Sequence, residues 1–265
     1  MQYSNKDHTF AVCAYGESPY LPECIASLLR QTDSDSIIIT TSSPNQFIRE
    51  VADKYNIKLY IRDGQSNIAD DWNFAYESAQ AKLITIVHQD DIYLEDYKRE
   101  MIEKINSSKK PLIAFSNYME LRGETAVTDN HVLNIKKIML RPLSHKNQWG
   151  KVWVRRRILS LGNPICCPSV MYVKDNLETP LFSKGLRSNL DWETWERISR
   201  CKGDFVYCNQ QLMEHRIHPD STTTALISEN KRSDEDYVIF RRFWPALFAR
   251  MLTRFYSESE KSNDL

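Results

Sequence analysis

The sequence predicts an α/β protein with a mostly parallel central sheet, helices on both faces of that sheet, and a helical extension at the C-terminal end. Over the first 120 residues, short apolar runs alternate with segments whose apolar residues recur at helical spacing. The links between these segments are short, which favours crossover connections between parallel strands. Near the C-terminus, apolar residues again follow helical spacing.

The predicted elements follow from two kinds of pattern. Helices are identified by apolar residues three and four positions apart, as at Leu21, Ile25 and Leu28, where Ser18 and Pro19 mark the start. Strands are identified by shorter apolar runs between turn residues. In chain order we expect a strand at 9–15, a helix at 18–32, a strand at 36–43, a helix at 45–55, a strand at 57–63, a helix at 68–79, a strand at 82–88, a helix at 94–105 and a strand at 111–117.

Beyond residue 120 the pattern is irregular. We expect only a helix at 191–201, a strand at 204–218 and a helix near the C-terminus. The chain has no G-x-G-x-x-G after the first strand and no G-x-x-x-x-G-K-[ST] motif, so a dinucleotide fold and a P-loop are poorly supported.

Composition narrows the class of protein. With 265 residues, 42 % hydrophobic and 26 % charged, the chain suits one large globular domain, alone or with an appendage. Lys plus Arg (35) equals Asp plus Glu (35), so we expect no nucleic-acid partner. The six cysteines form no C-x-x-C pair, which is typical of reduced thiols. The first residues resemble no signal peptide and no apolar run approaches ~20 residues, so we expect a cytoplasmic protein.

Paired acids stand where such a fold places its site, because ligands of parallel sheets bind at the carboxyl ends of the strands. Asp90 and Asp91 follow the predicted strand 82–88 directly. A divalent cation would cancel their repulsion and would also bind a diphosphate. Alternatively, one of them caps the helix that begins near Leu94.

Two further groups of residues suit chemistry. Asp191 opens a predicted helix and could take a proton from an acceptor hydroxyl, with Trp192 and Trp195 stacking on a sugar ring. The alternative is a helix cap beside two core tryptophans. At the end of strand 204–218, Arg216 could hold phosphate oxygens and His218 could ligate a metal.

Taken in order, these motifs resemble those of a family 2 glycosyltransferase of the GT-A fold, of the type that makes bacterial polysaccharides. The resemblance covers about residues 8–222. It rests on "AVCAYGESPYLPECIASLLRQT", "HQDDIYL", "GNPICCPSVMYVK", "LDWETW" and "HRIHPDS".

The resemblance implies a role for each motif. Asp90 would contact the ribose or the donor sugar, Asp91 would ligate Mg²⁺ or Mn²⁺, and His218 would lie near the metal as a further ligand. Asp191 would be the base of an inverting displacement. Ala14, Tyr15 and Asn73 would line the nucleotide pocket. Thr41 or Ser42 would also line it; these two residues follow the second strand, where the family usually has an acid.

The same resemblance implies a division of the chain and a pair of substrates. Residues 1–222 would form the GT-A domain, with a nucleotide-binding half (1–120) and an acceptor-binding half (121–222), and residues 223–265 would form an amphipathic helical extension. The donor would be a nucleotide-diphosphate sugar. The acceptor would be a glycan or a lipid-linked saccharide in surface polysaccharide synthesis.

Two basic stretches raise the question of a membrane or a second subunit. Residues 131–174 contain nine Lys or Arg and no acid, and residues 240–256 combine arginines with apolar residues at helical spacing. Such segments can be solvated or can pack on their own domain. Alternatively, they contact anionic lipid at the inner face of the membrane, or another copy of the chain. Two other functions stay open: a sugar nucleotidyltransferase, and a non-catalytic subunit that binds a nucleotide sugar.

Overall fold

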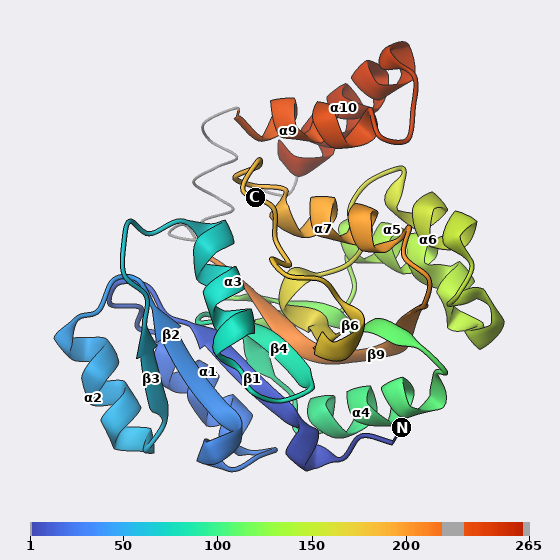
Figure 1. Ribbon diagram of the computed structural model, residues 1–265. Coiled ribbons are helices and arrows are strands. Elements are labelled where there is room, and N and C mark those ends of the chain that lie inside the picture. The colour runs from blue at the N-terminus through green and yellow to red at the C-terminus, as the bar shows by residue number, and fades with distance from the viewer. Residues whose placement is uncertain (1, 219–230, 262–265) are drawn as a thin grey trace.

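The fold is known from a computed structural model that describes residues 2–218 and 231–261 (Figure 1). It confirms the predicted class: helices surround a curled central sheet in which most strands run the same way, and the C-terminal end is helical. The predicted boundary at 222/223 lies outside the described residues. The boundary at 120/121 falls within one long strand of the sheet, and this division of the chain stays a prediction.

The sheet contains nine strands within the described residues. Across the sheet the order is β3 (Lys58–Ile61), β2 (Ile37–Thr41), β1 (His8–Cys13), β4 (Leu83–His88), β8 (Val170–Val173), β6 (Pro111–Arg122), β9 (Asp204–Ile217) and β5 (Ile92–Tyr93), while β7 (Thr125–Val127) pairs with β6. Only β8, β5 and β7 run antiparallel to their neighbours. The carboxyl ends of β1, β2, β4 and β9 therefore point the same way.

The first four helices lie where the sequence predicts them, with shifted ends. They are α1 (Leu21–Leu29), α2 (Gln46–Tyr55), α3 (Ile68–Ser78) and α4 (Tyr97–Ser107). The starts of α2 and α3 are capped by Asn45 and Asn67, whose side-chain oxygens accept backbone N–H bonds of 2.8 and 3.0 Å. Right-handed crossovers place α1 and α2 on one face of the sheet and α3 on the other.

The irregular middle of the sequence forms short elements that the pattern analysis did not assign. They include α5 (His131–Leu140), α6 (Val152–Leu159) and strand β8, which inserts antiparallel between β4 and β6. The helix α7 (Leu190–Ile198) agrees with the prediction at its start. Apolar residues of these elements join the same core as the strands, so one sheet carries both halves of the chain.

The C-terminal helices pack on α7 and hold the segment that leads into it. These helices are α9 (Lys231–Phe240) and α10 (Ala246–Lys261), and Pro245 directly precedes α10. The Glu235 carboxylate accepts backbone N–H bonds of 2.7, 2.8 and 3.0 Å from Arg187, Ser188 and Asn189. Asn189 is the N-cap residue of α7, and Arg187 and Ser188 precede it, so Glu235 of α9 fixes the segment that leads into α7.

Ionic and apolar contacts extend this interface. Arg242 donates to Glu193 at 2.9 Å and to Glu196 at 3.2 Å, and Glu196 itself is 2 % exposed. The Trp244 indole N–H donates to the carbonyl of Ser160 at 2.6 Å. One side of the C-terminal extension is therefore packed on its own domain.

We predict that Glu235→Gln destabilises the protein by about 1–3 kcal/mol, the usual cost of leaving a hydrogen-bond donor without its partner. The carboxamide NH₂ would face backbone N–H donors, whereas the carboxylate accepts from all of them. The free energy of unfolding from urea titration measures the loss. Asp234→Asn, on the same helix but exposed, is the matched control.

The loss of stability caused by Glu235→Gln should depend on pH. Burial alone would raise the pKa of Glu235, but hydrogen bonds from Ser188 and the backbone of residues 187–189 outweigh burial and lower it. The stabilisation is then complete above the ordinary value of 4.5 and is lost as the pH falls through the lowered pKa. A difference between wild type and Glu235→Gln that is as large in acid as at neutral pH would contradict this account.

Candidate functional site

The paired acids stand in a turn between β4 and β5, where they are held by the end of β9. Asp91 is fully buried, and its Oδ1 accepts the backbone N–H of Arg216 at 3.1 Å and lies 2.9 Å from His215 Nδ1. Asp90 Oδ2 lies 2.9 Å from His218 Nε2. The pairing of β5 with β9 produces these contacts between residues more than a hundred positions apart.

Neither acid caps the following helix. The N-cap of α4 is Asp96, and between it and the acids the chain forms the short strand β5. The helix-cap interpretation of Asp90 and Asp91 is therefore wrong, because the segment after them is extended.

A histidine that the sequence analysis left without a role completes the cluster. His88 is the last residue of β4, and one ligand atom from each of His88, Asp90 and Asp91 lies within 4.8 Å of the others. Two buried atoms there, Nε2 of His88 and Oδ2 of Asp91, have no hydrogen-bond partner within the described chain. Buried polar atoms normally have partners, so this donor set fits a divalent cation.

Electrostatics agree with an ionised carboxylate at Asp90. Burial would raise the pKa of Asp90, but the nearby His88 and the hydrogen bond with His218 outweigh it, so the pKa lies below its ordinary value. An ionised carboxylate is the form that ligates metals.

Arg216, predicted to hold phosphate oxygens, has protein partners in the structure. Its Nε donates to the Asp90 carbonyl at 2.9 Å, its Nη2 donates to Glu23 at 2.6 Å, and the guanidinium lies 4.4 Å above the Tyr20 ring. These contacts fix the turn that carries Asp90. A contact between Arg216 and phosphate stays a prediction.

The end of β1 is tied to the turn with the acids by a side-chain amide. Gln89 accepts from the backbone N–H of Tyr15 at 2.9 Å and donates to its carbonyl at 3.0 Å. The Tyr15 side chain is 62 % exposed. Gly16 follows with φ +61 and donates to Ser43 at 3.1 Å, so the loops after β1 and β2 are joined as well.

The other predicted nucleotide contacts at this edge are partly or fully buried. Ala14 is 4 % exposed, and its N–H donates to the Thr40 carbonyl. The Thr41 hydroxyl accepts from the backbone of Ser43. The Ser42 hydroxyl oxygen is buried with no hydrogen-bond partner within the described residues.

Asn73, also predicted to line the nucleotide pocket, serves the fold instead. It is buried, and its carboxamide makes two 2.8 Å bonds to the backbone N–H and carbonyl of Phe182. The Phe182 ring in turn packs edge-on against Trp72. A nucleotide contact by Asn73 stays a prediction, but its amide already has a structural task.

Asp191 lies in the first turn of α7 and is only partly buried. Its Oδ2 accepts from Asn163 at 2.6 Å, and its Oδ1 accepts from the backbone of Trp192 at 2.7 Å. The N-cap of α7 is Asn189, so Asp191 is not the cap. Trp192 and Trp195 are fully buried, so they belong to the core and the predicted stacking on a sugar ring is wrong.

Two buried cysteines, Cys166 and Cys167, are affected by the charges of both Asp91 and Asp191. Burial, followed by the charge of Asp191 and then of Cys166 and Asp91, raises the pKa of the Cys167 thiol well above its ordinary value. One thiol therefore lies close enough to Asp191 and to Asp91 to be affected by both charges. The structure thus brings the predicted base and the predicted metal site to the same region.

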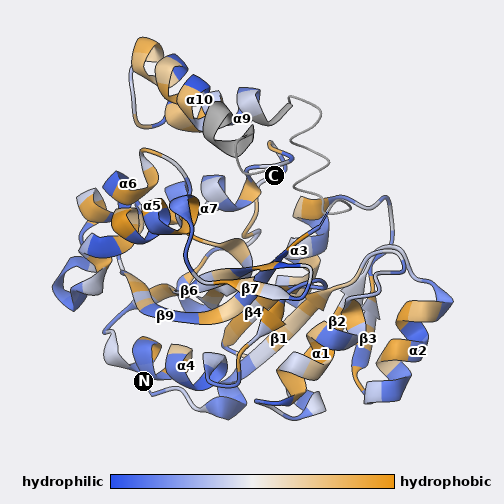
Figure 2. Cartoon of the chain, turned by 180° about the vertical axis from the view of Figure 1, so that it is seen from behind, coloured by the Kyte–Doolittle hydropathy of each residue, from blue (hydrophilic) through white to orange (hydrophobic). Residues whose placement is uncertain are grey.

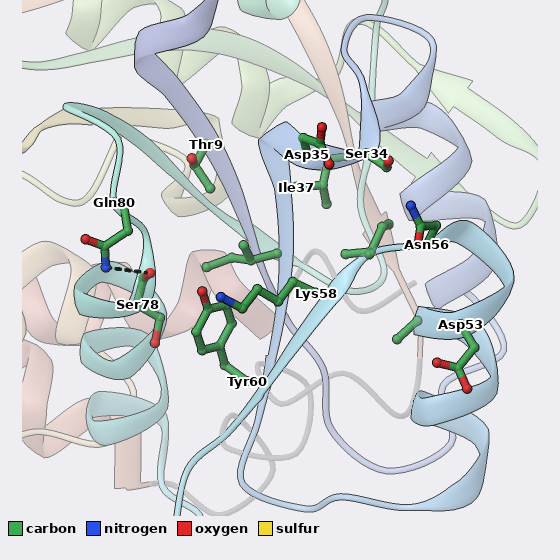
Figure 3. Close-up of a pocket in the computed structure, with 13 residues that line it drawn as sticks. Thr9, Ser34, Asp35, Ile37, Asp53, Asn56, Lys58, Tyr60, Ser78 and Gln80 are labelled. Carbon is green, nitrogen blue, oxygen red and sulfur yellow. Dashed lines mark hydrogen bonds between the residues drawn. The ribbon is translucent and has the colours of Figure 1, made fainter.

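A separate cavity opens at the other end of the strands (Figure 3). Its volume is about 520 Å³, and its lining includes Thr9, Asp35, Asn56, Lys58 and Tyr60. These residues lie at or near the amino ends of β1, β2 and β3, and none of the predicted site residues is among them.

Comparisons with known proteins agree with this arrangement. The model of glycosyl transferase family 2 matches residues 9–161. No curated protein sequence matches the chain. Among solved structures, S. aureus TarS 1–349 in complex with UDP-GlcNAc is similar with a TM-score of 0.61 and 13 % identity, over 93 % of this chain and 70 % of that one.

A second similar structure comes from another organism. The mannosyltransferase PcManGT from Pyrobaculum calidifontis, in complex with GDP-Man and Mn²⁺, has a TM-score of 0.59 and 12 % identity, over 95 % of this chain and 69 % of that one. At these identities the likeness establishes the fold, which is the GT-A fold of both glycosyltransferases. Because the family model covers more than half of its residues, the chain belongs to glycosyl transferase family 2.

Proposed function

We propose that this glycosyltransferase is metal-dependent and inverting, and that it transfers a sugar from a nucleoside-diphosphate sugar to a hydroxyl of a glycan or lipid-linked acceptor in surface polysaccharide synthesis. The observation that carries the proposal is the pair of unpartnered buried atoms on His88 and Asp91, beside Asp90, at the carboxyl end of the sheet. A nucleotide sugar bound in each of the two similar structures supports the choice of donor.

The donor would lie along the carboxyl ends of β1, β2 and β4. Ala14 and Tyr15, with Thr41 and Ser42, would contact the nucleotide, and the unpartnered hydroxyl of Ser42 is available for a hydrogen bond to the base. Asp90 would contact the ribose or sugar, and Asp91 would hold Mg²⁺ or Mn²⁺, with His218 nearby. The ion would stabilise the charge of the leaving diphosphate by several kcal/mol.

Asp191 would accept the proton of the acceptor hydroxyl as its oxygen attacks the anomeric carbon from the side opposite the diphosphate. A single displacement of this kind inverts the anomeric centre. Asn163 donates to one carboxylate oxygen of Asp191 and so orients it. The partial exposure of Asp191 leaves it accessible to an acceptor.

The outer face of α10 supports a position at the membrane surface. Leu247 is 78 % exposed and Phe255 63 %, Phe248 and Met251 are also exposed at helical spacing from them, and Arg250 and Arg254 between them are exposed. Figure 2 shows hydrophobic and hydrophilic residues mixed along α10. An apolar face bordered by cations suits anionic lipid, where each nearby Lys or Arg contributes about 1 kcal/mol. None of the helices described is long and apolar enough to cross a bilayer.

We expect Asp191→Asn to spare donor binding and to lower turnover by ~10²-fold or more, the usual loss on removing a general base. Initial rates of sugar transfer and calorimetric donor binding would be compared with those of Glu178→Gln, an exposed acid. Unchanged turnover would contradict the role of Asp191 as the base. Donor binding without measurable transfer by the wild type would instead favour the non-catalytic nucleotide-sugar-binding subunit.

We expect one of UDP, dTDP, GDP and CMP to raise the melting temperature in the presence of Mn²⁺ and not with EDTA. Ligand at a hundred times its Kd adds about 2.7 kcal/mol to the stability of the native state. Asp91→Asn should abolish the shift because it removes a metal ligand. A shift that persists in this variant, or with EDTA, would argue against a metal-bound diphosphate.

For the membrane contact, the wild type should float with vesicles of phosphatidylcholine and phosphatidylglycerol and not with phosphatidylcholine alone. The double variant Phe248→Ser/Phe255→Ser should stay at the bottom of the gradient. The control is Ile61→Ser, at an exposed apolar position of β3, and this variant should float as the wild type does. Flotation of the double variant would exclude this face. A change in its sedimentation coefficient would instead assign the face to a second copy of the chain.

A further inference from the structure

We propose that His88 is a direct ligand of the metal and that the site therefore prefers transition-metal ions such as Mn²⁺ and Co²⁺ over Mg²⁺. This inference rests on the proposed metal-dependent transfer, and it names a ligand and an ion class that the acid pair alone does not specify.

The position of His88 fits a metal bond better than a hydrogen bond. Its Nδ1 lies 3.8 Å from Asp91 Oδ2, beyond hydrogen-bond distance, and its Nε2 is buried without a hydrogen-bond partner among the residues described. Two ligands bound at about 2.1 Å to one ion lie up to about 4.2 Å apart. The ligand atoms of His88, Asp90 and Asp91 lie within 4.8 Å of one another, so side-chain movements on the order of an ångström would bring them around one ion.

The hydrogen bonds of Asp91 leave the matching oxygen for the ion. Oδ1 of Asp91 is taken by His215 and by the backbone of Arg216. Oδ2, the oxygen that faces His88, is buried without a hydrogen-bond partner among the residues described. Hydrogen-bond partners of a ligating carboxylate orient it toward the ion. Here His215 and the backbone of Arg216 would orient Asp91 so that Oδ2, which has no hydrogen bond within the described part of the chain, faces His88.

The His88 ring is held in place by a chain of packed side chains. It stacks on Trp72, with ring centroids 5.1 Å apart and 19° between the planes. Trp72 packs on Phe182, whose backbone is bonded by Asn73. A ring fixed by such packing loses little further freedom when it binds an ion, which is the condition for a well-formed ligand.

The ion preference follows from the imidazole nitrogen. Mg²⁺ favours oxygen ligands and gives up its water reluctantly, whereas affinity for nitrogen donors rises from Mn²⁺ to Co²⁺. We therefore expect binding to strengthen in the order Mg²⁺, Mn²⁺, Co²⁺. In a site built from Asp90 and Asp91 alone, this difference would be smaller.

The test measures ion binding to the full chain without donor. Free Mn²⁺ is counted by electron paramagnetic resonance, and competition gives the affinities of Mg²⁺ and Co²⁺. Fluorescence is a second readout, because a bound paramagnetic ion beside the Trp72–His88 stack should quench Trp72. Trp72→Phe identifies that part of the signal.

We expect His88→Ala to weaken Mn²⁺ binding by about tenfold or more, on the scale of losing a metal-site partner. His88→Asp should keep ion binding while moving the preference toward Mg²⁺. His88→Gln serves if the smaller side chain unfolds the protein, and His131→Ala, an exposed histidine, is the matched control.

The outcomes separate this inference from the proposed function. If His88→Ala and His88→Gln bind Mn²⁺ as the wild type does while Asp91→Asn does not, the site is a metal site and His88 is not its ligand. If the wild type binds no ion, or if Asp91→Asn binds as well as the wild type, the metal-dependent function falls together with the inference.

Discussion

The site depends on the complete burial of a carboxyl group, that of Asp91. An isolated carboxylate in a protein interior is so unfavourable that it would take up a proton, unless partners offset the lost hydration. Here the partners are His215 and the backbone N–H of Arg216, both delivered by β9. The two-residue strand β5 brings β9 into that position, so a short antiparallel pairing fixes the electrostatics of the site.

The same requirement explains the length of β9. It pairs with β6 along its whole length, from Asp204 opposite Pro111 to Ile217 opposite Arg122, with irregular register near Ser116 and Asn117. The long pairing anchors the strand, which lets its last residues act as fixed partners of the turn at Asp90 and Asp91. On a free loop, the same histidines would lose side-chain and backbone freedom on reaching the acids.

Local patterns predicted the first four strands and helices and the positions of Asp90, Asp91 and Asp191, because these depend on periodicity and strand ends. Contacts between distant segments were not predictable in this way. Strand β5 is too short to show a period, and β8 is a four-residue strand whose place between β4 and β6 has no local signal. The stacking role expected for Trp192 and Trp195 depended on which way the side chains face, and the fold turns both inward.

The C-terminal helices illustrate a similar limit. The spacing of apolar residues in α10 predicts a helix with an apolar side, and the structure shows apolar residues on two sides, one packed on the domain and one exposed. The Glu235 carboxylate, which bonds the backbone just before α7, belongs to α9. It lies 47 positions further along the chain than Ser188, one of the residues it bonds. Helix α7 carries Asp191, so the predicted base stands on an element whose preceding segment is held by the chain's last part.

Gln89 has a consequence for how ligands would communicate. Its carboxamide joins the loop after β1 to the turn that carries the acids through two hydrogen bonds. A nucleotide that orders the first loop and an ion that orders the turn would then act on one shared element. Thermodynamic linkage makes such coupling reciprocal: whatever factor the ion adds to nucleotide affinity, the nucleotide adds to the affinity for the ion.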